Sequence, residues 1–176
     1  MPDLKNHQSE TSKHRSLFLP HIPLCDVLDV GAGGDPIVPW AICCEKTSGV
    51  MAQVGDAPIH LDLDCRRLPF MGNSLRGVYS SHMLEDLEYP EQIKALNEWK
   101  RCLLPGGGVI ALLLPDQQRY LAHCRATGQD INLAHKEPTF GLEEFKLKVW
   151  TQVSGFKILE ARDLEDYSFM FIATKL

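Results

Sequence analysis

The chain has 176 residues, of which 44% are hydrophobic and 23% charged, and its formal net charge is -5. This size and composition are typical of one globular domain with a layered core and little room for a separate substrate domain. The acidic balance argues against a surface that binds nucleic acid or anionic lipid. No apolar run approaches the roughly 18 residues of a membrane-spanning helix, and no signal-peptide pattern is found.

The spacing of the cysteines and histidines indicates neither disulfides nor a metal site. The six cysteines contain no C-x-x-C pair, and Cys25, Cys43 and Cys44 lie in apolar stretches, where a free thiol behaves as a small hydrophobe. The seven histidines show no spacing that places two of them on one helix face beside an acid. We therefore expect a reduced, cytoplasmic protein with no bound metal.

The chain opens with polar residues and then turns into a strand and a glycine turn. Residues 1–16 are expected to form a flexible segment, and residues 17–176 a single domain. The short, β-branched run 26–30 predicts a buried strand. The glycines that follow it allow positive φ and close approach of the backbone to a ligand. Pro36 stands where the dinucleotide fingerprint needs a third glycine, which disfavours an NAD-dependent oxidoreductase.

The remaining segments alternate between strand and helix patterns. Strand patterns cover residues 40–45, 58–64, 76–81, 109–114, 156–161 and 167–174, and helix patterns cover residues 90–104, 117–126 and 142–153. The run 109–114 is entirely apolar, as expected of a central parallel strand. This alternation predicts a doubly wound α/β sheet, in which ligands lie at the carboxyl ends of the strands.

Four motifs in this order resemble the class I S-adenosylmethionine-dependent methyltransferases, in particular their small, type 11-like members. The motifs are Val27–Gly34, Asp64–Phe70, Val78–Leu87 and Trp99–Gly107, and the resemblance covers about residues 25–176. It implies a Rossmann-like, mostly parallel seven-stranded sheet with helices on both faces and an antiparallel last strand.

The resemblance also implies a position for the cofactor S-adenosylmethionine at the glycine turn. Gly31, Ala32 and Gly33 would pass under its methionine part, and Asp29 would orient its amino group. The cofactor is a sulfonium without phosphate, so nearby carboxylates favour it and no phosphate cradle is needed. The alternative for Asp29 is a role in a loop or cap.

Later motifs supply the other expected contacts. The resemblance implies that Asp64 accepts a hydrogen bond from the adenine amino group and that Cys65 lies beside the ring. The alternative for Asp64 is again a structural role in a loop or as a helix cap. Ser80, Ser81 and His82 would end the strand that flanks the transferred methyl group.

The chain departs from the family between the first two strands, because the crossover helix is abbreviated. Too few residues separate the glycine turn from Trp40–Glu45 for the usual helix between parallel strands. In the preferred interpretation, this run is the second strand and Glu45 binds the ribose hydroxyls. In the alternative, residues 36–47 form the helix, Val50–Val54 form the strand, and Asp56 is the ribose-binding acid.

Two histidines are candidates for the chemistry. Methyl transfer is an in-line displacement in which the protein aligns the reactants and removes a proton where the acceptor requires it. His82 follows a strand end that should face the methyl group, although it could instead start the helix at Met83–Leu87. His135 lies in a loop expected over the acceptor pocket, and its alternative is that of a solvated loop residue.

The sequence does not identify the methyl acceptor. An open cleft would suit a protein or a glycan, and a homodimer could instead complete a pocket for a small molecule. Nucleic acid is disfavoured by the lack of a basic surface. A different class of function is a cofactor-binding protein without its own activity, in agreement with the abbreviated crossover and with Arg76, where many relatives carry an acid.

Overall fold

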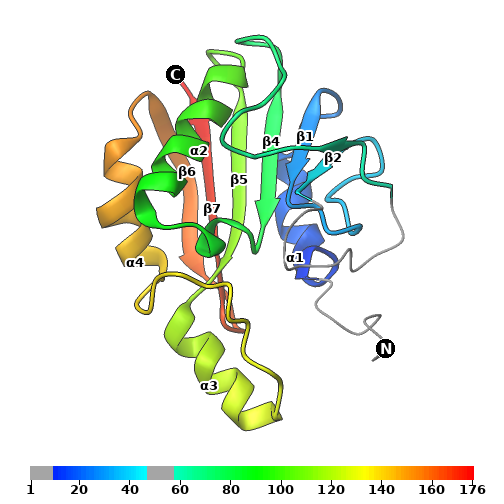
Figure 1. Ribbon diagram of the computed structural model, residues 1–176. Coiled ribbons are helices and arrows are strands. Elements are labelled where there is room, and N and C mark those ends of the chain that lie inside the picture. Colours follow the sequence, from blue (N-terminus) through cyan, green and yellow to red (C-terminus); the bar gives the residue numbers. More distant parts are fainter. Residues whose placement is uncertain (1–9, 47–57) are drawn as a thin grey trace.

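A computed structural model describes residues 10–46 and 58–176, and these form a seven-stranded sheet with the order β3-β2-β1-β4-β5-β7-β6 (Figure 1). The strands are β1 (Val27–Val30), β2 (Ile42–Glu45), β3 (Leu61–Asp62), β4 (Gly77–Ser81), β5 (Val109–Pro115), β6 (Phe156–Asp163) and β7 (Ser168–Lys175). β7 is antiparallel to β5 and β6, and the other neighbouring pairs are parallel. The mostly parallel sheet with an antiparallel last strand, predicted from the sequence, is confirmed.

Helices cover both faces of the sheet. They are α1 (Glu10–Phe18), α2 (Tyr89–Cys102), α3 (Gln117–Thr127) and α4 (Leu142–Glu144), with short helical turns η2 (Leu19–His21), η3 (Leu84–Asp86), η4 (Phe145–Val149) and η5 (Trp150–Gln152). α2 and α4 lie on one face, α1 lies on the other, and α3 projects beyond the sheet (Figure 1). No helix within residues 10–46 and 58–176 has the length and apolar character needed to cross a membrane.

Helix ends follow local sequence signals. α2 starts with Pro90 in its first turn, where the missing N–H costs nothing. α3 starts where the Asp116 carboxylate accepts a hydrogen bond from the backbone N–H of Arg119, and it ends at Gly128, which has a φ of 75°. The helix predicted over 142–153 is present as α4 followed by η4, a π-helical turn, and by the 3₁₀ turn η5.

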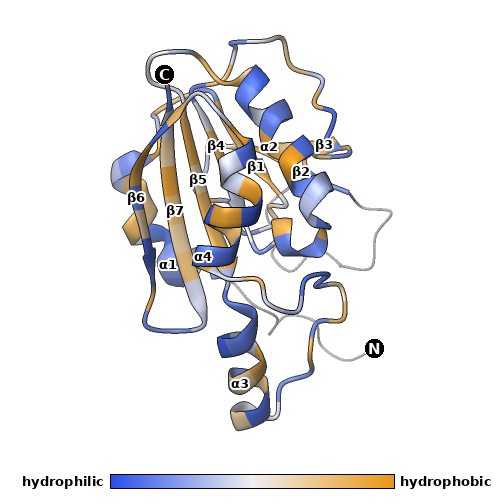
Figure 2. Ribbon diagram, turned by 90° about the vertical axis from the view of Figure 1, so that its left-hand side faces the viewer, coloured by the Kyte–Doolittle hydropathy of each residue, from blue (hydrophilic) through white to orange (hydrophobic). Residues whose placement is uncertain are grey.

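The two faces of the sheet carry separate apolar cores. On the face of α2 and α4, Trp99 and Phe145 are fully buried with residues of β4, β5 and β7. On the face of α1, Phe18 packs edge-on against Tyr79, at 5.3 Å between ring centroids. β5 and β7 are apolar along most of their length, whereas the edge strand β6 is largely hydrophilic (Figure 2). Burial on both faces explains the uninterrupted apolar run of β5.

The expectation of a flexible segment over residues 1–16 is wrong for residues 10–16, which belong to α1. This helix has few apolar residues, so its sequence shows no amphipathic pattern. Polar contacts hold it: the backbone N–H and Oγ of Ser12 donate to Asp35 at 2.8 and 2.6 Å, and Arg15 donates to Asp35 at 2.7 Å. Phe18 then anchors its carboxyl end. The packed unit therefore includes residues 10–16 together with the residues from 17 onward.

The crossover between β1 and β2 contains no helix, as the preferred interpretation requires. β2 pairs in parallel with β1, with Leu28 opposite Ile42. The alternative helix over 36–47 is therefore wrong, since 42–45 is a strand. The alternative strand Val50–Val54 and its acid Asp56 lie outside the described residues.

Removal of the Phe18 side chain should test whether α1 belongs to the core. Phe18 is fully buried, and Phe18→Ala should lower the free energy of unfolding by about 3–5 kcal/mol, through lost burial and a residual cavity. Leu19, which is 45% exposed, provides the control, and Leu19→Ala should cost less than about 1 kcal/mol. Urea denaturation measures both values. Equal, small losses would show that α1 does not contribute to the core.

Candidate functional site

A pocket of about 310 Å³ opens at the carboxyl ends of β1, β2 and β4. Its walls come from the glycine turn after β1, the end of β2, the loop after β3, the turn after β4, and the loop before α4. Four of the predicted cofactor-binding residues line it: Gly31, Glu45, Asp64 and Cys65. This is the edge of the sheet where open α/β folds bind ligands, because the strand order reverses at β1, which lies between β2 and β4.

The glycine turn is fixed to the end of β2. Gly31 and Gly33 have φ values of 75° and 55°, which side chains rarely adopt. The N–H groups of Gly31 and Ala32 donate to the Cys44 carbonyl at 2.9 and 3.4 Å. Methyl addition at Gly31 would bring a Cβ within 2.8 Å of the Met83 side chain, so the turn after β4 packs directly on this glycine.

Glu45 lies at the pocket wall and also closes the glycine turn. One of its carboxylate oxygens accepts a hydrogen bond from the Gly33 N–H at 3.2 Å, and the other accepts from the Lys46 N–H at 3.1 Å. The N–H groups of Gly31, Ala32 and Gly33 therefore have partners within the protein, and the Glu45 carboxylate lies beside them. Such a site disfavours a phosphate and suits a ligand with hydroxyl donors or positive charge.

Asp29 lies behind the turn and not in the pocket wall. It is buried, and its Oδ2 accepts a hydrogen bond from the Ile37 N–H at 2.7 Å. Burial raises the pKa of Asp29 to about 7, although the Ile37 hydrogen bond acts in the opposite direction. Through this hydrogen bond, Asp29 holds the crossover between β1 and β2 in place.

Asp64 and Cys65 line the pocket after β3. The Asp64 carboxylate accepts hydrogen bonds from the backbone N–H and the Nε of Arg66, at 2.9 and 2.8 Å. These bonds hold the pKa of Asp64 well below its usual range, so the group is ionised. Arg66 also pairs with Glu91 on α2, which anchors the loop. Burial raises the pKa of Cys65 to about 12, so its thiol is neutral.

Asp86 is a pocket residue that the sequence analysis did not single out. It lies at the end of η3, lines the pocket, and has a buried Oδ1 without a hydrogen-bond partner among the described residues. Burial raises the pKa of Asp86 to about 6, an effect that the nearby charge of Lys136 opposes. The adjacent acids Glu85 and Asp86 within the motif Val78–Leu87 were the available signal, but only the fold shows that Asp86 lines the pocket.

The polar residues at the end of β4 are held by contacts outside the lining of this pocket. Ser80 is buried, and its Oγ donates to the Val30 carbonyl at 2.8 Å, which ties β4 to β1. Ser81 ends the strand and pairs with Leu113 of β5. His82 has a φ of 47°, an uncommon value for a residue other than glycine. None of Ser80, Ser81 and His82 is part of the described pocket wall.

His82 and His135 meet at a buried carboxyl group, that of Glu85. The Glu85 Oε1 lies 3.6 Å from His82 Nδ1 and 3.9 Å from His135 Nε2. Burial raises the pKa of Glu85 and lowers the pKa values of His82 and His135 to about 4 each. Both imidazoles are therefore neutral near pH 7.

The loop that carries His135 forms part of the pocket wall through its neighbours. Ala134 and Lys136 line the pocket, and the Lys136 N–H donates to the Glu85 carbonyl at 2.9 Å. The His135 ring itself points inward, with its Nδ1 at 2.6 Å from Gln117 Oε1. The alternative of a solvated loop histidine is wrong, since the side chain is only 5% exposed.

The raised pKa of Asp29 should appear in the pH dependence of stability. The folded chain holds this proton up to about pH 7, while the unfolded chain releases it near 3.8, so stability falls as pH rises between these values. Asp29→Asn lacks this penalty and keeps an acceptor for Ile37. From pH 5 to pH 7, the stability of the variant relative to the parent should rise by about 2 kcal/mol.

Urea denaturation at the two pH values measures this difference. Asp163→Asn, at a carboxyl group whose side chain is 60% exposed, controls for the loss of one acid. A difference between parent and Asp29→Asn that stays constant with pH would contradict the raised pKa.

Comparison with known proteins agrees with the fold. Residues 28–111 match the family model described as a methyltransferase domain. This range contains the glycine turn, the end of β2, the loop after β3 and the turn after β4. No curated protein matches the sequence.

Solved structures share the fold at low sequence identity. A protein from Pyrococcus horikoshii has a TM-score of 0.70 at 14% identity, over 99% of this chain and 94% of its own. A protein from Thermotoga maritima, described as an S-adenosylmethionine-dependent methyltransferase and possible histamine N-methyltransferase, has a TM-score of 0.66 at 15% identity, over 94% and 89%. A Haloferax volcanii complex of a methyltransferase with the activator Trm112 has a TM-score of 0.64 at 14% identity, over 98% and 91%.

Proposed function

With the resemblance to the class I S-adenosylmethionine-dependent methyltransferases confirmed, in the fold and in the family match of residues 28–111, we propose that the pocket binds S-adenosylmethionine for transfer of its methyl group to an O, N or S acceptor. The observation that carries the proposal is the position of Glu45. Its carboxylate ends β2, lines the pocket and touches the glycine turn, which suits the two hydroxyls of a ribose.

The remaining walls fit the other parts of this cofactor. The unpartnered Oδ1 of Asp86 is a buried acceptor that suits a cationic group, either the sulfonium or the ammonium of the methionine part. Asp64 is ionised and keeps lone pairs for an adenine amino group beside those that Arg66 uses. Cys65 and Leu63 offer neutral surface for the ring.

When bound, the cofactor supplies an electrophilic methyl carbon: its bond to sulfur breaks as a bond to the acceptor forms, and S-adenosylhomocysteine is left. An acceptor that carries a proton must lose it. We propose that His82 takes this proton, since the ring is neutral near pH 7 and follows the end of β4 directly. Its left-handed backbone conformation is a strained feature of the kind that gathers at functional sites.

His135 would act through its neighbours. Its ring bonds to Gln117 and faces Glu85, so it positions the carboxyl group that His82 also faces. Removal of this ring would shift the loop that brings Ala134 and Lys136 to the pocket. We therefore propose His135 as a positioning residue on the acceptor side.

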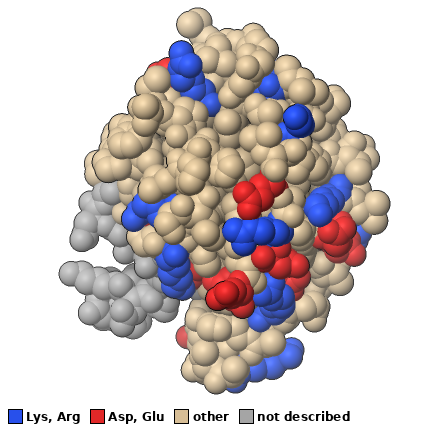
Figure 3. Space-filling model, turned by 180° about the vertical axis from the view of Figure 1, so that it is seen from behind, with Lys and Arg blue, Asp and Glu red and all other residues tan. Residues whose placement is uncertain are grey.

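The distribution of surface charge and a solved complex bear on the acceptor and the partners. On the face drawn in Figure 3, acidic and basic side chains are mixed, and among the residues in colour no single sign covers a broad area. This supports a small molecule, a protein or a glycan as acceptor in preference to nucleic acid. A homodimer or an activator, as in the Haloferax volcanii complex, is the partner to test where the chain alone shows no turnover.

Cofactor binding tests the proposal directly. S-adenosylmethionine and S-adenosylhomocysteine should bind in the micromolar range by isothermal titration calorimetry, and NAD should not bind. Glu45→Gln should weaken binding about 10- to 100-fold, since it replaces charge-assisted hydrogen bonds to the ribose. Asp56→Asn, at the alternative acid, should leave the affinity within about twofold, as expected of a group that does not bind the cofactor.

Measurements of cofactor binding and of methyl transfer together distinguish a methyltransferase from a cofactor-binding protein without its own activity. No binding of either sulfur compound would overturn the proposed site. Binding without transfer of a labelled methyl group to any acceptor, with or without a partner, would favour a cofactor-binding protein that lacks its own activity. If Asp56→Asn lowered the affinity strongly and Glu45→Gln did not, Asp56 and not Glu45 would be the acid that binds the ribose.

With an acceptor found by transfer of the labelled methyl group, His82→Asn tests the proton acceptor. Asparagine tolerates the left-handed backbone, so the fold should persist, while turnover should fall by roughly 100-fold or more. The affinity for S-adenosylmethionine should stay unchanged, because His82 is not in the pocket wall. Since the pKa of His82 is about 4, the parent should lose no turnover through this group between pH 8 and pH 6. Full turnover in the variant would contradict the assignment.

A further inference from the structure

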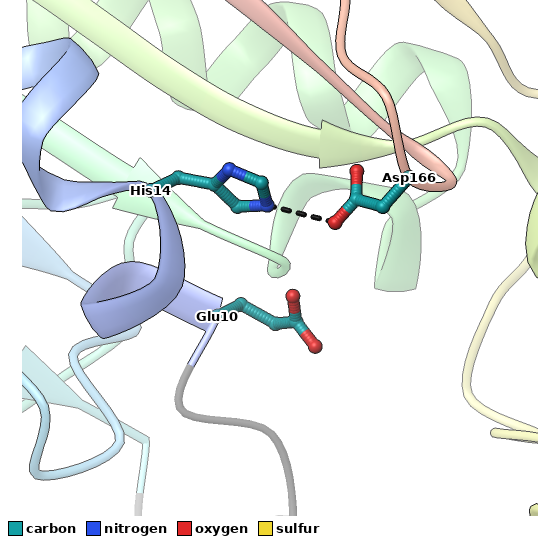
Figure 4. Close-up of side chains that lie close together, drawn as sticks. All are labelled: Glu10, His14 and Asp166. Carbon is teal, nitrogen blue, oxygen red and sulfur yellow. Dashed lines mark hydrogen bonds and ion pairs between the residues drawn. The ribbon is translucent and has the colours of Figure 1, made fainter.

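A second cluster of chemical groups lies where α1 meets the turn between β6 and β7. Glu10 and His14 are four residues apart on α1, and Asp166 belongs to the turn before β7. The three side chains point toward one another (Figure 4). One ligand atom from each lies within 4.8 Å of the other two, and within residues 10–46 and 58–176 this is the only such group of three.

Both carboxylates of the cluster accept hydrogen bonds from neighbouring groups of the protein. Glu10 Oε1 accepts hydrogen bonds from Lys13 Nζ at 2.8 Å and from the Tyr167 hydroxyl at 2.7 Å. Asp166 Oδ1 accepts from the Ser168 N–H at 2.8 Å, and its Oδ2 lies 2.7 Å from His14 Nε2. Metal ligands are typically oriented in this manner by outer hydrogen bonds.

An unpartnered buried oxygen points to a missing ligand. Glu10 is only 3% exposed, and its Oε2 has no hydrogen-bond partner in the described part of the chain. A buried carboxylate oxygen without a partner costs free energy, which a cation would offset. Lys13 does not fill this position, because its ammonium group contacts Oε1 and its side chain is 50% exposed.

From this geometry we propose that Glu10, His14 and Asp166 bind a divalent transition-metal ion. Two carboxylates and one imidazole are the ligands of Mn²⁺, Fe²⁺ and Zn²⁺ sites, and the two negative charges balance the ion. Three protein ligands leave further positions for water. No local sequence pattern indicates this site, because its third ligand comes from the opposite end of the chain.

The site would be coupled to the acceptor side of the protein. Tyr167 donates to Glu10, and its ring lies edge-on to His82 at 6.0 Å between centroids. Ser168, which fixes Asp166, has its Oγ 3.4 Å from His82 Nε2. A bound ion would therefore fix α1 against β7 beside His82. The site itself does not depend on the proposed methyl transfer, and its test is separate.

Binding of Mn²⁺ to the full-length chain tests the proposal, because this ion favours carboxylate and imidazole over the thiols of the cysteines. Loss of the free-ion signal in electron paramagnetic resonance should give one bound Mn²⁺ per chain. Glu10→Gln and His14→Gln should each weaken binding by about tenfold or more, and Tyr167→Phe, which removes an outer hydrogen bond, by roughly tenfold. Mn²⁺ should also raise the Tm of the parent and not of Glu10→Gln.

The control is Glu160→Gln, which disrupts another histidine–carboxylate pair, that of His21 and Glu160 at 3.5 Å. It should bind Mn²⁺ as the parent does. Circular dichroism of each variant without metal shows whether it folds, and His14→Gln serves where Glu10→Gln does not fold. No saturable Mn²⁺ binding, or equal binding by the parent, Glu10→Gln and His14→Gln, would overturn the proposal.

Discussion

The hydrogen bond between the buried Asp29 carboxyl group and the Ile37 N–H is the interaction on which the site depends. A crossover between parallel strands is normally a helix that satisfies its own backbone groups, and here the connection from β1 to β2 is too short for one. Asp29 satisfies a backbone group of this connection from within the sheet. It thereby sets where the glycine turn lies and how close Glu45 comes to it.

The same short connection explains why α1 belongs to the domain. Without a crossover helix, the face of the sheet around Tyr79 would be left open, and Phe18 covers it. Asp35, in the connection, accepts the hydrogen bonds that place α1. The helix in turn brings Glu10 toward Tyr167, so that the proposed metal site follows from the way the chain compensates for the missing helix.

Strong local patterns predicted much of this architecture. The apolar run that became β5 and the glycine turn after β1 were evident, because burial and positive φ select a few residue types. Helix α1 was missed because polar tertiary contacts, and not an apolar periodicity, hold it. In the site, the pocket position of Glu45 followed from the strand pattern. The inward turn of His135 and the orphan oxygen of Asp86 depend on packing between distant segments, which no local pattern contains.

The central claim is that this compact crossover still builds a binding site for S-adenosylmethionine at the carboxyl edge of the sheet. A crystal structure of the protein grown with S-adenosylhomocysteine tests it most directly. We expect electron density between the glycine turn and Asp86, with the ribose hydroxyls on Glu45 and the adenine beside Cys65. Density elsewhere on the molecule, or a pocket with Glu45 and Asp86 turned away from the ligand, would contradict it.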